Sequence, residues 1–140
     1  MNASVELVKN FQAELVKNFL HGDPRAILRK NLTEDFQCIE PPQMPVGGTF
    51  TGWGASLEIM AIYAKHWEVE CLKMEIFGGD GSNVVAAKGT WRWTSKETGR
   101  TITSPVVELF TVENGKIKSI EVFQSNPAGI CATLPGRWRY

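Results

Sequence analysis

Glu108 is a carboxylate in an unusual sequence context, because it lies within an otherwise apolar run, Val106 to Phe110. A carboxylate in apolar surroundings is costly unless it is paired or protonated, and a protonated carboxyl can serve in acid–base chemistry. The alternative is a position on the outer face of a sheet, where Glu108 would pair with Arg92 or Lys118.

His66 is a second candidate for proton transfer. It directly precedes Trp67 at the end of a predicted helix. Histidine is the side chain whose ordinary pKa suits acid–base work near neutral pH. A histidine at the C-terminus of a helix is also stabilised by the helix dipole without any catalytic role, so both interpretations stay open.

The middle of the chain is rich in tryptophan, with Trp53, Trp67, Trp91 and Trp93. Trp91 and Trp93 share one face of a predicted strand with Gly89, because side chains alternate along a strand. Aromatic walls suit a flat, apolar, ring-containing ligand, and indole N–H groups can orient its polar ends. They suit a dimer interface equally well.

Composition excludes several classes of protein. The 140 residues carry 15 Lys+Arg and 15 Asp+Glu, so no excess of basic residues is available for nucleic acid. No apolar run approaches the roughly 20 residues of a membrane span, and the first residues do not resemble a signal peptide. The three cysteines and two histidines lack metal-site spacing, and no glycine-rich nucleotide loop occurs. We therefore expect one reduced, cytoplasmic domain without cofactor, metal, nucleic-acid or membrane partner.

The first half of the chain is predicted to be mostly helical. An amphipathic pattern begins after Ser4, a candidate N-cap, and ends at Gly22, a candidate C-cap. Further elements are expected in chain order, namely a helix over 24–30, a strand over 35–40, a loop over 41–54 and a helix over 53–67.

The second half is predicted to be an antiparallel meander. Strands are expected over 67–77, 84–95, 101–112 and 117–124, and Asn114-Gly115 between the last two is a strong hairpin signal. The fold class is therefore α+β, with a single domain over residues 1–124. Residues 125–140 form a tail that packs on the domain or frays.

Several motifs occur in a characteristic order. His21-Gly22-Asp23 follows the first helix, Glu40-Pro41 ends the first strand, Gly47 to Gly52 precedes the third helix, and Glu113 to Ile117 forms the last hairpin. Together, over about residues 5–124, they resemble the SnoaL-like and ketosteroid-isomerase-like branch of the NTF2-like superfamily. The resemblance implies a cone, in which a curved antiparallel sheet and three helices enclose an apolar pocket. It also implies cofactor-free proton transfer and a homodimer formed through the sheet.

The resemblance also assigns roles to residues. Glu40 matches the general base, with Glu in place of the usual Asp; its alternative is a solvated carboxylate at a loop mouth. Glu108 matches the protonated acid that stabilises an oxyanion, although an ungapped hairpin alignment puts Val107 there instead. Leu15 occupies the place of the isomerase's tyrosine. Tyr63 could donate in its stead, or could be an ordinary half-buried tyrosine.

We therefore expect an isomerase, cyclase or lyase acting on a hydrophobic, enolisable polyketide, terpenoid or steroid-like molecule. The alternative is a non-catalytic domain that binds an apolar ligand or a partner protein. An epoxide hydrolase of this fold would need an Asp–Arg–Asp relay that the sequence does not supply. The expected catalytic residues are Glu40, Glu108 and His66, and the expected substrate-binding residues are Trp53, Tyr63, Trp91, Trp93 and Phe123.

Overall fold

The first helix, α1, spans Ala3–Phe19 in the computed structural model, which describes residues 2–19 and 23–136, with only the backbone at 18 and 19. Its buried face includes Val8 and Phe11, as the amphipathic pattern predicts. Ser4 is not its N-cap. The side-chain oxygen of Asn2 accepts hydrogen bonds from the backbone N–H groups of Ser4 (2.8 Å) and Val5 (3.3 Å), so Asn2 caps the helix. The expected C-cap, Gly22, and the motif residue His21 lie outside the described residues.

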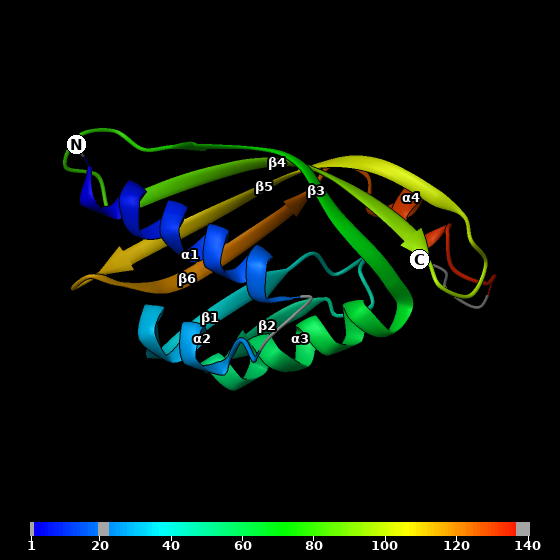
Figure 1. Ribbon diagram of the computed structural model, residues 1–140, viewed down its shortest axis with the longest axis horizontal. Coiled ribbons are helices and arrows are strands. Elements are labelled where there is room, and N and C mark those ends of the chain that lie inside the picture. Colours follow the sequence, from blue (N-terminus) through cyan, green and yellow to red (C-terminus); the bar gives the residue numbers. More distant parts are fainter. Residues whose placement is uncertain (1, 20–22, 137–140) are drawn as a thin grey trace.

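Two more helices lie in the N-terminal half, α2 (Arg25–Asn31) and α3 (Trp53–His66), each close to its predicted range. In Figure 1, α1 crosses one face of the sheet while α2 and α3 lie along its lower edge. The expectation of three helices in this half is confirmed. No helix in the described part of the chain is long and apolar enough to cross a membrane.

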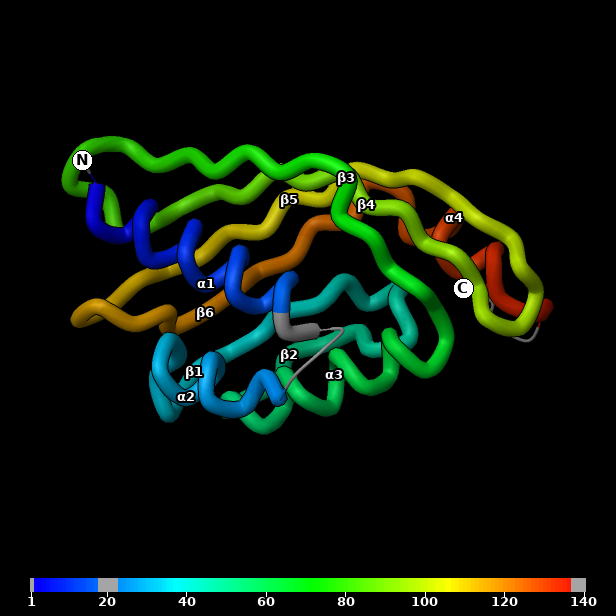
Figure 2. Tube along the Cα trace, viewed as in Figure 1, coloured from blue at the N-terminus to red at the C-terminus, as the bar shows by residue number. Residues whose placement is uncertain are grey.

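One six-stranded sheet, in the order β2-β1-β6-β5-β4-β3, forms the rest of the domain. The predicted meander consists of β3 (Trp67–Phe77), β4 (Val84–Ser95), β5 (Thr101–Glu113) and β6 (Lys116–Gln124). Its last hairpin turns at Asn114 and Gly115, which have positive φ angles of 51° and 75°, as a tight primed turn requires. The strand β3 shifts register between Cys71 and Lys73, and the trace of β3 bends along its length in Figure 2.

The sheet is mixed and not wholly antiparallel, which corrects the sequence-based expectation. The first strand, β1 (Leu32–Glu40), pairs with β6 in parallel, with Cys38 opposite Ile120 and Ile39 opposite Glu121. The alternation of apolar residues shows which face of β1 is buried but carries no information about its partner or direction. After β1, the chain passes through β2, α3 and the meander, and its last strand, β6, returns beside β1 in the same direction.

The segment predicted as a loop over 41–54 contains a short edge strand, β2 (Gly48–Thr51). It pairs antiparallel with the end of β1, and Gly48 lies opposite Glu40. Four residues flanked by glycine and proline carry too little pattern to be recognised as a strand. Because β2 and β6 hold β1 from both sides, the backbone near Glu40 is firmly positioned.

The tail contributes to a second apolar cluster at one end of the sheet. Residues 127–131 form helix α4 (Pro127–Cys131), and Ile130 and Leu134 are fully or almost fully buried against Trp67 and Trp93. The indole N–H of Trp67 donates to Thr133 Oγ1 at 2.8 Å. Residues 125–136 therefore pack on the domain, and the basic-aromatic end of the tail, residues 137–140, lies outside the described residues.

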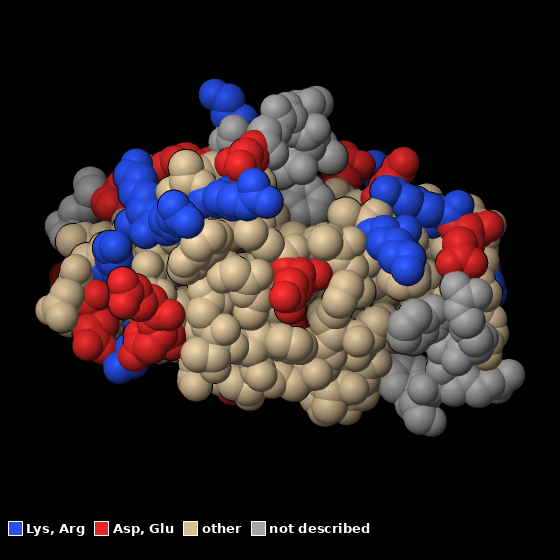
Figure 3. Space-filling view, turned by 90° about the horizontal axis from the view of Figure 1, so that it is seen from below, with Lys and Arg blue, Asp and Glu red and all other residues tan. Residues whose placement is uncertain are grey.

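Charge is distributed over the surface without a continuous basic patch on the face shown in Figure 3. On its described residues, Lys and Arg side chains gather toward the two sides of the view, interspersed with Asp and Glu, and the broad area between them is uncharged except for an acidic side chain at its centre. The distribution agrees with the equal numbers of acidic and basic residues in the sequence.

Candidate active site

A large cavity lies between the concave face of the sheet and the helices α1 and α3. Its volume is about 760 Å³, within the range of small-molecule sites. Most of its wall is apolar, with Phe11 and Leu15 from α1, Phe36 from β1 and Ile59 from α3. A few polar side chains interrupt this wall, and they define what the cavity can do.

Glu40 is the first of these polar side chains. It ends β1, lines the cavity and is only 7% exposed. The hydroxyl of Tyr63 donates to its Oε2 at 3.0 Å, and the thiol of Cys38 contacts its Oε1 at 3.7 Å. Burial raises the pKa of Glu40 to about 7, against the opposing effect of the two hydrogen bonds. Glu40 can therefore gain or lose a proton near neutral pH.

Glu108, on β5, also faces the cavity, so the choice between Glu108 and Val107 falls on Glu108. The side-chain amide of Gln12, on α1, donates to its Oε1 at 3.3 Å. Burial is the largest cause that raises the pKa of Glu108 to about 7, and the charge of Glu40 adds to it. Glu108 therefore tends to keep its proton while Glu40 is ionised.

The two carboxyl groups approach the cavity from strands on either side of β6. Glu108 pairs with Val122 of β6, and Ile39, the residue before Glu40, pairs with Glu121, the residue before Val122. The two acids therefore lie on strands to either side of β6, close to Val122. When two carboxyl groups face one site, the protonated one can act as the acid while the ionised one acts as the base.

Three of the five expected ligand-binding aromatic residues line the cavity, namely Tyr63, Trp91 and Trp93. The rings of Tyr63 and Trp93 meet edge to face, with centroids 5.4 Å apart. The hydroxyl of Tyr63 is already bound to Glu40, so this residue positions the carboxylate as well as forming part of the wall.

Comparison with known proteins identifies the fold. No protein-family model and no curated protein matches the sequence. An NTF2-like protein of unknown function from Burkholderia pseudomallei superposes with a TM-score of 0.79 at 19% identity, over 97% of this chain and 100% of its own. The chain has the NTF2-like fold.

Two further solved structures extend the comparison. A SnoaL-like protein from Mesorhizobium loti, proposed to be a polyketide cyclase, matches with a TM-score of 0.62 and 24% identity over 84% of this chain and 96% of its own. TerC, co-crystallised with polyporic acid, matches with a TM-score of 0.76 and 21% identity over 91% of this chain and 95% of its own. At sequence identities this low, the comparison shows a shared fold and nothing more. The function therefore has to be argued from the site.

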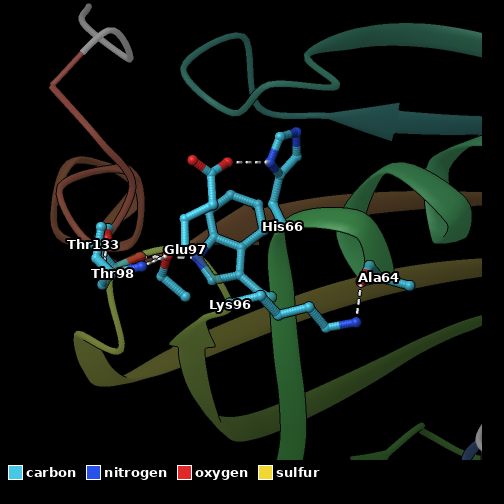
Figure 4. Close-up of polar contacts among 8 residues, drawn as sticks. Ala64, His66, Lys96, Glu97, Thr98 and Thr133 are labelled. Carbon is cyan, nitrogen blue, oxygen red and sulfur yellow. Dashed lines mark hydrogen bonds and ion pairs between the residues drawn. The ribbon is translucent and has the colours of Figure 1, made fainter.

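Three expected site residues do not line the NTF2-like cavity. His66 ends α3, and its Nδ1 lies 4.0 Å from Glu97 Oε1 (Figure 4). In the same view, Lys96 Nζ donates a hydrogen bond to the backbone oxygen of Ala64. Trp53 stacks under the guanidinium of Arg29, 4.7 Å from the ring centroid. Phe123 is 49% exposed on β6. The structure therefore brings together Glu40, Glu108, Tyr63, Trp91 and Trp93, and leaves these three apart.

Sequence reasoning missed two residues that line the cavity and contact its carboxyl groups, Gln12 and Cys38. Gln12 is a polar residue within the apolar stripe of α1, four residues after Val8, and this interruption was a usable signal. Cys38 is two residues before Glu40, so strand alternation places both on one face. Burial, with added effects of Glu40 and Glu108, raises the pKa of the Cys38 thiol, which makes it a hydrogen-bond donor and not a nucleophile. In the described part of the chain, no group of three or more potential metal ligands occurs.

Proposed function

We propose that this protein is a cofactor-independent enzyme of the isomerase or cyclase type, which transfers a proton on a hydrophobic, enolisable small molecule. The observation that carries the proposal is the pair of carboxyls, buried Glu40 and half-buried Glu108, facing one large apolar cavity. Each has its own hydrogen-bond donors, and both have a pKa raised to about 7. Acid–base catalysis is most effective when the pKa lies near the working pH.

The first step is a proton transfer from carbon. Ionised Glu40 takes a proton from the carbon next to a ligand carbonyl, and an enolate remains. Its Oε1 is the better placed oxygen, because the thiol of Cys38 holds it less strongly than the hydroxyl of Tyr63 holds Oε2. Protonated Glu108 donates a hydrogen bond to the enolate oxygen, and a low-dielectric cavity makes such a bond effective.

The second step decides the reaction type. In an isomerisation, Glu40 returns its proton to a different carbon of the enolate. In a cyclisation, the enolate carbon bonds to a second carbonyl carbon of the same molecule, and the alkoxide that forms takes the proton from Glu40. The apolar wall holds the ring system in either case. TerC, crystallised with polyporic acid, and the proposed polyketide cyclase support an organic ring compound as the ligand.

A non-catalytic, ligand-binding domain is the second candidate. One observation favours it: Leu15 lines the cavity from α1 and offers no hydroxyl, while the hydroxyl of Tyr63 is engaged by Glu40. Under this alternative, the carboxyls orient a polar group of the ligand but exchange no proton with its carbon atoms.

Deuterium exchange at carbon separates the two functions. A panel of polycyclic ketones is incubated in D₂O with the protein, and deuterium incorporation next to the carbonyl is followed by mass spectrometry. We expect exchange above the buffer rate with the wild type, and a loss of about 100-fold or more with Glu40→Gln, the size of a general-base effect. Glu121→Gln is the control, because Glu121 neighbours Val122 on β6 but does not line the cavity. Binding of the ketones without any exchange would favour the non-catalytic domain.

A further inference from the structure

The C-terminal segment, residues 125–136, binds an aromatic side chain that borders the cavity. This side chain is Trp67, which is only 1% exposed. Its indole N–H donates to Thr133 Oγ1 at 2.8 Å, and the same hydroxyl donates to the backbone oxygen of Ile130 at 2.7 Å. A buried polar contact whose members are all satisfied holds a single arrangement. The Trp67 indole is therefore oriented by the C-terminal segment.

Thr133 is itself held by the turn between β4 and β5. The hydroxyl of Thr98 donates to the backbone oxygen of Thr133 (Figure 4). The guanidinium of Arg100 donates to the backbone oxygen of the next residue, Leu134, at 2.9 Å. On the other side of the segment, the side chains of Leu134 and Ile130 are buried in the smaller apolar cluster. The hydroxyl that receives the indole N–H thus has a fixed place.

Trp67 packs in turn against Tyr63. The backbone N–H of Trp67 donates to the backbone oxygen of Tyr63 where α3 ends, and the centroids of their rings lie 6.0 Å apart. Trp93 completes a triangle of rings, 5.3 Å from Trp67 and 5.4 Å from Tyr63. These distances lie in the range of specific aromatic pairs. Because protein interiors are close-packed, the Trp67 indole cannot turn without displacing the Tyr63 ring.

Tyr63 carries this constraint to Glu40. Its hydroxyl donates to Glu40 Oε2 at 3.0 Å and lowers the pKa of Glu40 more than the thiol of Cys38 does, against the larger effect of burial. Such a hydrogen bond weakens steeply when the donor is misaligned. The C-terminal segment also contacts the loop that follows Glu40, since the thiol of Cys131 donates to the backbone oxygen of Gln43 at 3.5 Å. Two connections therefore lead from this segment toward the same carboxyl.

We propose that Thr133 is a positioning residue for Glu40, which acts through Trp67 and Tyr63. The C-terminal segment is then part of the active site, although none of its described residues lines the cavity. This inference deepens the proposed function, because it rests on Glu40 as the base of the proposed reaction. A merely structural role of Thr133 would affect stability alone, whereas positioning also changes the proton affinity of Glu40.

The variant Thr133→Val tests the proposal, because it keeps the shape of the side chain and removes the hydroxyl. The Glu40 carboxyl is titrated by ¹³C NMR, which requires no substrate. Without its acceptor, the Trp67 indole loses its orientation, and the hydroxyl of Tyr63 is less well aligned with Glu40. The midpoint should therefore move to higher pH, with about a threefold change in the proton affinity of Glu40. An unmoved midpoint would overturn the proposal.

Two further variants separate positioning from a general loss of stability. Thr133→Ser keeps the hydroxyl and should titrate like the wild type. Ile130→Val removes a methylene group from the same segment, where Ile130 is fully buried, and keeps Thr133. It should therefore lower stability in urea unfolding without moving the Glu40 midpoint. Equal shifts in Thr133→Val and Ile130→Val would contradict a specific role of the hydroxyl.

A double variant tests the route through Tyr63. In the Tyr63→Phe background no hydroxyl remains to be aligned, so adding Thr133→Val should not move the midpoint further. Cys38 and Glu108, the other titratable side chains that interact with Glu40, are unchanged in each variant. A further shift as large as in the wild-type background would mean that Thr133 acts on Glu40 by another route, and the proposal would fall.

A second variant is available if Thr133→Val does not fold. Thr98→Val alters an exposed residue and removes the side-chain hydrogen bond to the Thr133 backbone. It should move the Glu40 midpoint in the same direction, and no movement would count against the proposal.

The titration and the deuterium exchange fail separately. The expected shift in a protein that exchanges no deuterium would support positioning and contradict proton transfer. Exchange that depends on Glu40, together with an unmoved midpoint in Thr133→Val, would support proton transfer and contradict positioning.

Discussion

The proton affinity of Glu40 results from opposing effects of its immediate surroundings. Burial favours the neutral acid, whereas the hydroxyl of Tyr63 and the thiol of Cys38 favour the carboxylate. Burial and the charge of Glu40 in turn raise the pKa of Tyr63, so its hydroxyl remains a donor at any physiological pH. In the proposed reaction, Tyr63 therefore acts through Glu40 and is a positioning residue.

The variant Tyr63→Phe tests this role. The hydroxyl of Tyr63, 3.0 Å from Glu40, stabilises the carboxylate and so lowers its pKa, while burial raises it. Without this hydroxyl, the pKa of Glu40 should rise above its value of about 7. Because the carboxylate is the active form, exchange at pH 7 should fall and recover at higher pH. The acidic limb of the rate–pH profile, and the ¹³C NMR titration of the Glu40 carboxyl, should both move to higher pH. An unmoved titration would show that Tyr63 does not tune Glu40.

The variant Glu108→Gln tests the burial of the second carboxyl through stability. The pKa of Glu108 is about 7 in the folded protein against a reference of 4.5, so the folded state binds more protons between these values. Stability from this group is full below pH 4.5 and is lost as the pH rises through 7. Glutamine has no charge to bury, so the variant should exceed the wild type in stability at pH 8, by up to about 3 kcal/mol.

Urea unfolding at pH 5 and pH 8 measures this difference. The wild type should lose stability between the two values more steeply than Glu108→Gln. Glu121→Gln is again the matched control and should keep the wild-type slope. Equal slopes for the wild type and Glu108→Gln would mean that Glu108 is solvated in the folded protein.

At the scale of elements, strand pairing positions the site. The end of β1 is held between β2 and β6, which fixes the backbone beside Glu40. On β4, the alternation of side chains puts Gly89 and Trp91 on one face, and the absent side chain of the glycine gives the indole its place over the sheet. The position of the Trp91 indole therefore depends on this single glycine.

The variant Gly89→Ala should disturb this packing. Its Cβ would lie 2.6 Å from Trp91 Nε1 and 3.2 Å from Trp91 Cδ1, so the indole must move. We expect a loss of stability of about 1–3 kcal/mol, typical of overpacking, and an altered tryptophan emission spectrum. Gly79→Ala is the control, because nothing lies within 4 Å of its Cβ. Unchanged stability and emission would show that the indole does not rest on Gly89.

At the scale of the whole molecule, two separate apolar clusters hold the fold together. The larger one joins the helices to the concave face of the sheet, and the smaller one joins the C-terminal segment to the far end of β3 and β4. Ile130 is 0% exposed in the smaller cluster, although it lies in the segment regarded from sequence as a tail. The segment closes the end of the sheet that carries Trp67 and Trp93.

The variant Ile130→Ala tests whether this segment belongs to the cooperative fold. Removal of a fully buried isoleucine side chain should cost about 2–4 kcal/mol of unfolding free energy, through lost burial and a cavity. Ile62→Ala is the matched control, since Ile62 is 38% exposed on α3, and its effect should be much smaller. Chemical denaturation of both variants gives the comparison. Equal effects would indicate that residues 125–136 are only loosely attached.

Local patterns in the sequence determined much of this protein. Helical periodicity located α1, α2 and α3, strand alternation and turn residues located the four meander strands, and Asn114-Gly115 specified its hairpin. These features depend on residues near one another in the chain, where steric and hydrogen-bonding preferences act directly. The ordered motifs also singled out Glu40 and Glu108, both of which line the cavity.

Only the tertiary structure decided what depends on distant residues. The parallel pairing of β1 with β6, the short strand β2 and the packing of α4 all involve partners far apart in sequence, and strand alternation carries no record of a partner. For the same reason, the sequence offered both faces for Glu108 and placed His66, Trp53 and Phe123 among the site residues. The contacts of Gln12 with Glu108 and of Tyr63 with Glu40 join α1 to β5 and α3 to β1, so they exist only when the helices close over the sheet.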